Sequence, residues 1–279
     1  MLQYDFMLNA FAATFIVASV AGSVGYFMVL RGQTFAGHAM SHVGFAGATA
    51  AVLAGVSPLT GLTAFTVLAG IGVGLLGERA QGRDLAIGIV LSLSLGLGLL
   101  FLHFYTSYAG QATALLFGNV LGVQRSTVWI MLAMGLVALL TLGAIARPLA
   151  FASLQPELAE AKGLSPRRLG VVFMVLVGLA VAESVQVVGI LLIFTLMVAP
   201  AAAALLVTQR LSTGVVCSAA LALFEAWVGL VLAFYTDWPA SFWITLLGAV
   251  AYLLALALKA GQRLLAERYF QRSLALRAP

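Results

Sequence analysis

Long apolar runs separated by short polar breaks make up most of this sequence, and they constrain its fold more than any other feature. A helix needs about 20 apolar residues to cross the roughly 30 Å of hydrocarbon in a bilayer. Seven runs meet this requirement clearly. They cover residues 6–30, 34–54, 58–77, 85–105, 126–146, 214–235 and 239–259. We therefore predict an all-α integral membrane protein.

The scarcity of charge excludes a water-soluble domain. Of the 279 residues, 63% are hydrophobic and only 8% are charged, whereas an ordinary soluble domain has about 25% charged residues. Such a chain cannot cover a surface that faces water, so lipid must be its solvent. The net charge of +5 is small and gives no indication of a nucleic-acid partner. The single cysteine, Cys217, cannot form an intrachain disulfide.

Two regions do not match one span each. Residues 168–207 form an apolar run that would be about 60 Å long as one helix, so we predict two helices joined by a tight turn. The polar cluster Glu183, Ser184 and Gln186 is the expected place of that turn. Residues 109–123 are apolar but short and contain glycines towards both ends, which favours a re-entrant or interfacial segment. The total is about nine transmembrane helices.

The basic residues support this count and give an orientation. With nine spans and an external N-terminus, all of the 14 lysines and arginines except Arg125 lie on one side. Because cytoplasmic segments carry the excess of Lys and Arg, we predict that the N-terminus is outside and the C-terminus inside. Residues 1–260 then form one transmembrane domain, and residues 261–279 form a basic cytoplasmic tail.

The loop at residues 147–168 is the only sizeable polar segment between the spans. Pro156 suits the start of a short helix, Glu157 its first turn and Gly163 its end, and Pro166 prevents further continuation. A capped surface helix of this kind is typical of a docking element. An ordinary connector between two spans explains the pattern equally well.

Two histidines lie four positions apart in the second predicted span. His38 and His42 therefore project from one face of a helix, at the spacing by which two imidazoles can share a zinc ion. Ionisable residues inside a bilayer are costly, and they often mark a transport pathway. The alternative is that each histidine hydrogen-bonds to a neighbouring helix and stabilises the bundle.

Four acidic or basic residues extend this pattern. We expect Glu225 at a depth similar to that of His42, and His103, Glu183 and Asp237 near the outer ends of their spans. Together they can supply oxygen and nitrogen ligands from an outer entrance to a deeper pathway. Alternatively, Glu225 is a protonated carboxylic acid bonded across a helix interface, and the other three are ordinary interfacial residues.

Catalytic motifs do not occur in this sequence. It contains no GxxxxGK[ST], HExxH, GxSxG or CxxC. We therefore do not expect an enzyme, and ATP-driven transport would need another chain to bind the nucleotide.

Several stretches resemble one family. Residues 37–42 (GHAMSH) resemble the G-D-x-x-[SA]-H signature of permease subunits of zinc- and manganese-type ABC importers. Residues 116–119 (LFGN) are similar to the family's LFG[DN] segment. Residues 188–192 (VGILL) and 200–204 (PAAAA) resemble its VGxLL…PAAxA helix, and residues 237–239 (DWP) its D-x-P loop. The similarity runs from about residue 30 to residue 258.

This resemblance implies a function that hydropathy alone does not. Such a permease moves divalent metal, here zinc first and manganese second, across the bacterial cytoplasmic membrane. Two copies would associate with ATP-binding cassette subunits and receive metal from an extracytoplasmic metal-binding protein. The resemblance implies no permanently bound cofactor: the metal is transported, and ATP is bound by the partner subunit.

The resemblance also gives roles to particular residues. The 147–168 loop looks like the coupling helix that contacts the ATPase, with Glu157, Ala161 and Gly163 in it. His42 lies at the position of the family's histidine, and His38 stands where many members have aspartate. Imidazole in place of a carboxylate shifts preference towards zinc.

Three other functions stay open at this point. A permease for iron or for a chelate, such as a siderophore or haem, would have the same architecture. An intramembrane enzyme could hold a catalytic zinc at His38 and His42, with Glu225 as general base. A secondary transporter would work without an ATPase, although nine spans and a capped loop fit it poorly.

Overall fold

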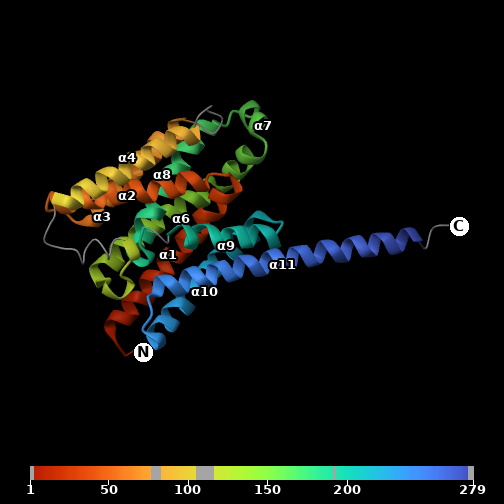
Figure 1. The fold of residues 1–279 in the computed structure, drawn as a ribbon. Coiled ribbons are helices and arrows are strands. Elements are labelled where there is room, and N and C mark those ends of the chain that lie inside the picture. The colour runs from red at the N-terminus through yellow and green to blue at the C-terminus, as the bar shows by residue number, and fades with distance from the viewer. Residues whose placement is uncertain (1–2, 77–82, 105–115, 191–192, 276–279) are drawn as a thin grey trace.

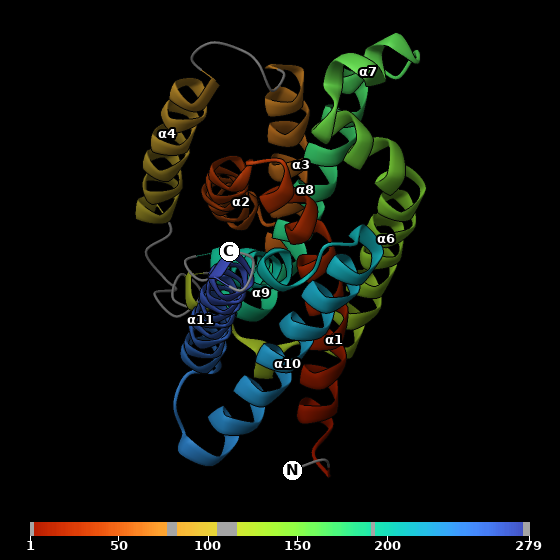
Figure 2. The same cartoon turned by 90° about the vertical axis from the view of Figure 1, so that its right-hand side faces the viewer.

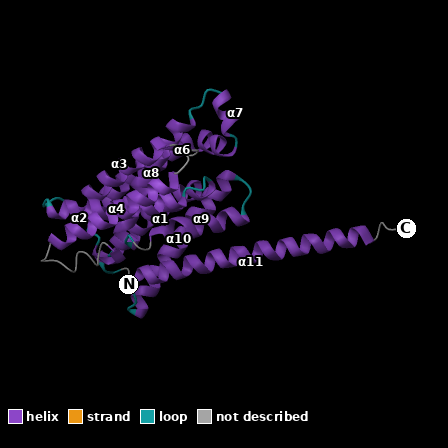
Figure 3. Ribbon diagram, turned by 45° about the horizontal axis from the view of Figure 1, so that its top comes forward, coloured by secondary structure: helices purple, strands orange, loops and turns teal. Residues whose placement is uncertain are grey.

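The computed structural model describes residues 3–76, 83–104, 116–190 and 193–275, and it contains helices but no strands over these residues (Figure 3). This confirms the all-α prediction. The long helices are α1 (Asp5–Leu30), α2 (Thr34–Leu53), α3 (Pro58–Leu76), α4 (Arg83–Phe104), α6 (Arg125–Leu154), α8 (Pro166–Val188), α9 (Ile193–Val207), α10 (Leu211–Thr236) and α11 (Ala240–Ala275). Two short elements are η1 (Val120–Gly122) and α7 (Pro156–Ala161).

Seven of the described helices are long and apolar enough to cross a membrane. They are α1, α3, α4, α6, α8, α10 and α11. The other two long helices are α2, with 20 residues, and α9, with 15. At 1.5 Å per residue, α9 is about 22 Å long, which is less than the thickness of the hydrocarbon core. Nine spans therefore stays a prediction.

Two helices form the centre of the bundle. In α1, 78% of the most apolar stretch is buried within the protein, and in α8 the share is 67%. α1 packs against α6, α8, α9 and α10, while α3 packs against both α2 and α8. α4 covers α2, and Figure 2 shows α4 and α11 along one flank with α6 along the other. Glu183 of α8 and Glu225 of α10 are fully buried among these helices, and the two histidines of α2 are half-buried.

The contact between α3 and α8 depends on glycine. A Cβ atom at Gly70 would lie 2.6 Å from the carbonyl oxygen of Met174, and one at Gly178 would lie 2.6 Å from that of Thr66. Only glycine allows the two backbones to approach so closely. Close approach of this kind replaces the hydrophobic driving force that is missing between helices in lipid.

The two ends of the bundle differ. The N-terminus and the connection between α10 and α11 lie at one end, while α7 and the C-terminus lie towards the other (Figure 1). This arrangement fits the predicted external N-terminus and internal C-terminus, and the orientation itself stays a prediction. α11 continues as a helix to Ala275, well beyond the rest of the bundle (Figure 1). Most of the predicted tail at residues 261–279 is therefore a continuation of this helix.

The predicted turn at Glu183, Ser184 and Gln186 is wrong. These residues lie inside α8, which continues to Val188, and the chain turns at Gly189 with a φ of 79°. Glycine adopts this left-handed conformation without steric cost. The hydroxyl of Ser184 donates to the carbonyl oxygen of Ala180 at 2.7 Å, so this polar group is satisfied within the helix.

The segment predicted to be re-entrant or interfacial is partly described. Residues 109–115 lie outside the described residues, and residues 116–123 contain the single turn η1. The backbone N–H of Gly122 donates to Asn119 Oδ1 at 3.1 Å, which closes this turn. η1 packs against α1 and α8.

Candidate functional site

His38 and His42 form a close pair on α2. Their ring centroids are 5.0 Å apart with an interplanar angle of 85°, as expected for residues one helical turn apart. Both side chains are half-buried. His38 also makes an edge contact with Phe194 of α9 at 5.5 Å. The histidine pair therefore lies where α2 faces α9.

One nitrogen of the pair has no protein partner. His42 Nδ1 is buried and forms no hydrogen bond. The nearby hydroxyl of Ser41 is not available to it, because it donates to the carbonyl oxygen of His38 at 2.7 Å. Buried polar atoms are nearly always satisfied, so an exception needs an explanation. A neutral imidazole nitrogen with a free lone pair can bind a metal cation.

Glu225 of α10 does not form a three-ligand metal group with the histidine pair. It is fully buried, and neither carboxylate oxygen has a hydrogen-bond partner. A Cβ atom at Gly248 of α11 would lie 3.0 Å from Glu225 Oε2 and 3.1 Å from Thr195 Cγ2. The carboxyl group thus sits between α10, α11 and the Thr195 face of α9. Phe194, which contacts His38, points about 100° away from Thr195 around the same helix.

Glu183 lies five residues before the last residue of α8, near the end of the helix that we predict to be the outer one, and its side chain is in a packed interior. It is fully buried, and neither of its carboxylate oxygens has a hydrogen-bond partner. A Cβ atom at Gly135 of α6 would lie 3.6 Å from Glu183 Oε1, and 3.0 and 3.1 Å from the Cγ2 atoms of Ile16 and Val20 of α1. The side chain is therefore enclosed by α1, α6 and α8, and its role at the metal entrance stays a prediction.

The remaining predicted ligands are exposed and separate. His103 lies in the last turn of α4 and contacts the ring of Phe104 at 5.7 Å. Asp237 ends α10 with a left-handed φ of 57°. Within the described ranges, no group of three or more His, Cys, Asp and Glu side chains could hold a metal ion. Of the six predicted ligands, only His38 and His42 are shown in contact.

A pocket at the end of the bundle near Asp237 combines two segments that are distant in the sequence. It has a volume of about 360 Å³, and it is lined by residues 117–121, Val187, Ala233 and residues 237–241. Gly118 also packs closely against Gly189, since a Cβ atom at Gly189 would meet the amide nitrogen of Gly118 at 2.3 Å. Part of LFGN thus shares one pocket with DWP, and Gly189 of VGILL contacts Gly118 beside that pocket. Spacing in the sequence gave no signal of this convergence.

The opposite end carries the short helix α7, and its predicted boundaries are confirmed. Pro156 is its first residue, and Gly163 follows it with a φ of 80°. The N–H of Gly163 donates to Glu160 O, and that of Leu164 donates to Ala159 O, which is a Schellman motif. Ala159 is fully buried, whereas Glu157, Ala161 and Gly163 are exposed. α7 is therefore attached on one face and free on the other.

These features define the class of the protein. Membrane-crossing helices pack around a half-buried histidine pair, with a pocket at one end and an exposed capped helix at the other, and this arrangement suits a transport permease. Residues 3–259 match the model of the ABC 3 transport family, and the chain belongs to this family. It is a multi-pass protein of the bacterial cytoplasmic membrane.

Named relatives cover almost the whole chain. It is similar to the manganese transport system membrane protein MntC of Listeria monocytogenes, with 29% identity over 95% of each chain. The manganese import system permease protein ScaB of Streptococcus gordonii is 31% identical over 95% of this chain and 96% of the relative. Among solved structures, PsaBC from Streptococcus pneumoniae in complex with Fab matches with a TM-score of 0.82 and 29% identity, covering 91% of this chain and 92% of that one.

Proposed function

We propose that this chain is the permease subunit of an ATP-driven importer that carries manganese into the cytoplasm. The observation that carries the proposal is the histidine pair His38 and His42, with its unpartnered nitrogen, on the helix that bears the family signature. The relatives reported above are named for manganese and not for zinc. This favours manganese over our first expectation of zinc.

The chemistry of the histidine pair suits transient binding of manganese during transport better than permanent binding. Imidazole binds Zn²⁺ more tightly than Mn²⁺, following the general order of affinity for first-row metals. Two imidazoles therefore hold Mn²⁺ weakly enough to release it, whereas Zn²⁺ stays bound for longer. We infer that zinc competes with manganese at this pair.

The two ends of the bundle then have different tasks. The pocket beside Asp237 faces outside and receives the metal from an extracytoplasmic binding protein. The exposed face of α7, with Glu157, Ala161 and Gly163, docks on a separate ATP-binding subunit in the cytoplasm. The arrangement has nine spans, and a second copy of the permease completes the transport unit.

In this proposal Glu225, His103 and Glu183 do not bind the metal ion together with the histidine pair. Glu225 lies at a separate position beside α9, and it does not bind the same metal ion as His42. His103 is not among the residues that line the pocket of Asp237, and Glu183 is enclosed among α1, α6 and α8.

Metal uptake tests the proposal directly. The chain is expressed with its ATP-binding subunit and binding protein in a strain that lacks its own manganese and zinc importers. We expect uptake of Mn²⁺ that His42→Ala abolishes and Ser41→Ala preserves, because the Ser41 hydroxyl bonds only within its own helix. Uptake unchanged by His42→Ala would favour a chelate permease, and uptake without the ATPase would disprove the ABC mechanism. Metal retained stoichiometrically by the purified protein would favour a zinc enzyme.

A further inference from the structure

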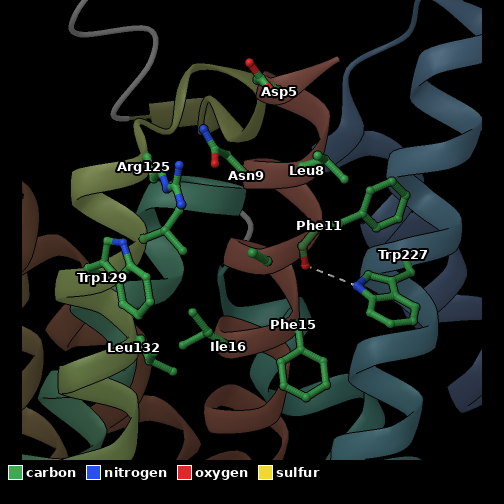
Figure 4. A pocket seen from close by; sticks show the side chains of 12 residues that line it. Asp5, Leu8, Asn9, Phe11, Phe15, Ile16, Arg125, Trp129, Leu132 and Trp227 are labelled. Atoms are coloured by element: carbon green, nitrogen blue, oxygen red, sulfur yellow. Dashed lines mark hydrogen bonds between the residues drawn. The ribbon is translucent and has the colours of Figure 1, made fainter. Parts of the chain in front are cut away.

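A second and larger cavity lies away from the histidine pair and from the pocket of Asp237. It has a volume of about 890 Å³, and residues of α1, α6 and α10 line it (Figure 4). The lining extends along α1 from Asp5 to Ile16, which is about 16 Å of helix. Trp129, on its α6 wall, is 62% exposed, so the cavity is open to the surroundings of the protein.

The lining changes from polar to apolar along this length. Asp5, Asn9 and Arg125 lie towards one end, which is where α1 and α6 begin (Figure 4). Phe15, Ile16 and Leu132 lie towards the other end (Figure 4). A membrane lipid has the same order of polarity, with a charged headgroup followed by apolar chains.

The polar end of the cavity has one positive and one negative side chain, and neither forms an ion pair with another described residue. Arg125 and Asp5 are both exposed, and no ion pair with another described residue involves either of them. Neither α1 nor α6 has a side-chain cap at its start. The free N–H groups of the two helix starts, together with the Arg125 guanidinium, favour a phosphate group. Asp5 and Asn9 can accept hydrogen bonds from an ammonium group.

The aromatic wall of the cavity is fixed in place. Trp227 Nε1 donates to the carbonyl oxygen of Phe11 at 3.4 Å (Figure 4), and its ring lies 5.9 Å from the ring of Phe11 and 6.2 Å from that of Phe15. Tryptophan is enriched at the headgroup level of membranes because it has an apolar ring and a polar N–H. The hydrogen bond to α1 fixes the Trp227 ring beside the apolar part of the cavity.

We propose that this cavity binds one phospholipid with a phosphoethanolamine headgroup. Arg125 and the two helix starts hold the phosphate, Asp5 and Asn9 hold the ammonium group, and the acyl chains lie along Phe15, Ile16 and Leu132. A second copy of this chain is the less suitable occupant, since it would bury Arg125 and Asp5 away from water. A lipid headgroup of mixed charge satisfies both residues at once.

Native mass spectrometry tests this proposal. The purified full chain is mixed in turn with phosphatidylethanolamine, phosphatidylcholine and phosphatidylglycerol, and the lipid that stays bound is measured. We expect phosphatidylethanolamine to be retained best, because the trimethylammonium of phosphatidylcholine cannot donate a hydrogen bond to Asp5. Arg125→Gln should lower its retention roughly fivefold, the order of effect of one exposed charge contact. Asp5→Asn should lower retention of phosphatidylethanolamine but not of phosphatidylglycerol. Arg210→Gln, which changes an exposed arginine between α9 and α10, serves as the control and should have no effect.

Two results would overturn the proposal. One is equal retention of phosphatidylethanolamine by the parent, Arg125→Gln and Arg210→Gln, with all three showing the same thermal unfolding. The other comes from a photo-reactive amino acid placed at Trp129 in membranes. A crosslink to a second copy, in place of an adduct with lipid, would show that the cavity is a protein interface.

Discussion

Arg31 Nη1 donates a 2.7 Å hydrogen bond to Ser153 Oγ, a residue 122 positions further along the chain. The contact joins the end of α1 to the last turn of α6, directly before α7. The same guanidinium lies 5.3 Å from the ring centre of Phe173 in α8. Burial, with the positive charge of Arg83 as a second cause, lowers the pKa of Arg31 to about 10, so the side chain is still charged at neutral pH.

We expect Arg31→Met to destabilise the attachment of α7 to the bundle. The substitution removes a hydrogen bond from a charged donor, which contributes about 1.5–3 kcal/mol. Thermal unfolding of the purified protein in detergent should show a lower Tm. Arg147→Met is the control, since Arg147 is exposed in the same end of α6. An equal change in Tm for both variants would contradict a specific role of Arg31.

Gly163→Ala should weaken coupling to the ATP-binding subunit and leave the bundle intact. The φ of 80° costs a residue with a Cβ atom about 1–2 kcal/mol, and no other group lies near enough to add a clash. We expect reduced manganese uptake with an unchanged Tm. Gly163→Asn should restore part of the uptake, because asparagine tolerates this conformation better. If alanine and asparagine behave alike, the Schellman motif is not the cause.

Gly189→Ala should disrupt the fold itself. It combines a φ of 79° with a Cβ atom that would lie 2.3 Å from the amide nitrogen of Gly118. We expect a loss of more than about 2 kcal/mol in the free energy of unfolding, seen as a lower yield and a lower Tm. Gly143→Ala in α6 is the matched control, because nothing lies within 4 Å of its Cβ position. That variant should gain up to about 1 kcal/mol from helix propensity.

His38→Asp should change the competition between metals more than the uptake of manganese. A carboxylate in place of one imidazole suits Mn²⁺ and weakens the affinity for Zn²⁺. We expect the zinc concentration that halves manganese uptake to rise about tenfold, as an oxygen ligand replaces a nitrogen. Competition assays with radioactive manganese give this value. An unchanged zinc concentration would show that zinc acts elsewhere in the importer.

Glu225→Gln should reduce manganese uptake by about twofold at most, equivalent to roughly 0.4 kcal/mol. The amide keeps the shape of the buried carboxyl beside Gly248, and Glu225 forms no three-ligand metal group with the histidine pair. A fall as large as that of His42→Ala would place Glu225 on the same ion-binding site. The comparison is made at equal amounts of protein in the membrane.

The sequence predicted those features that depend on local backbone chemistry. Pro156 and Gly163 delimit α7 as expected, because proline favours a helix start and glycine a left-handed end wherever they occur. The same logic failed near Glu183. The polar residues there predict a turn, but buried helices also contain such residues, and Gly189 is the better signal of the turn.

The positions of the ionisable side chains depend on packing and were not predictable in the same way. Spacing alone places His38 and His42 on one face of α2. Whether Glu225 meets them depends on which face α10 turns towards α9, and many distant contacts decide this. The pocket beside Asp237 likewise depends on the packing of residues 117–121 near residues 237–241, which no periodicity encodes.

The length of α11 has a mechanical consequence. A continuous helix from Ala240 to Ala275 fixes the distance between its two ends, and it also fixes the direction of its far end. One inserted residue would advance that end by about 1.5 Å and rotate it by about 100°. A flexible linker of the same length would erase any such dependence. A group attached directly after Ala275 would therefore be presented at a defined angle, which the length of the helix sets residue by residue.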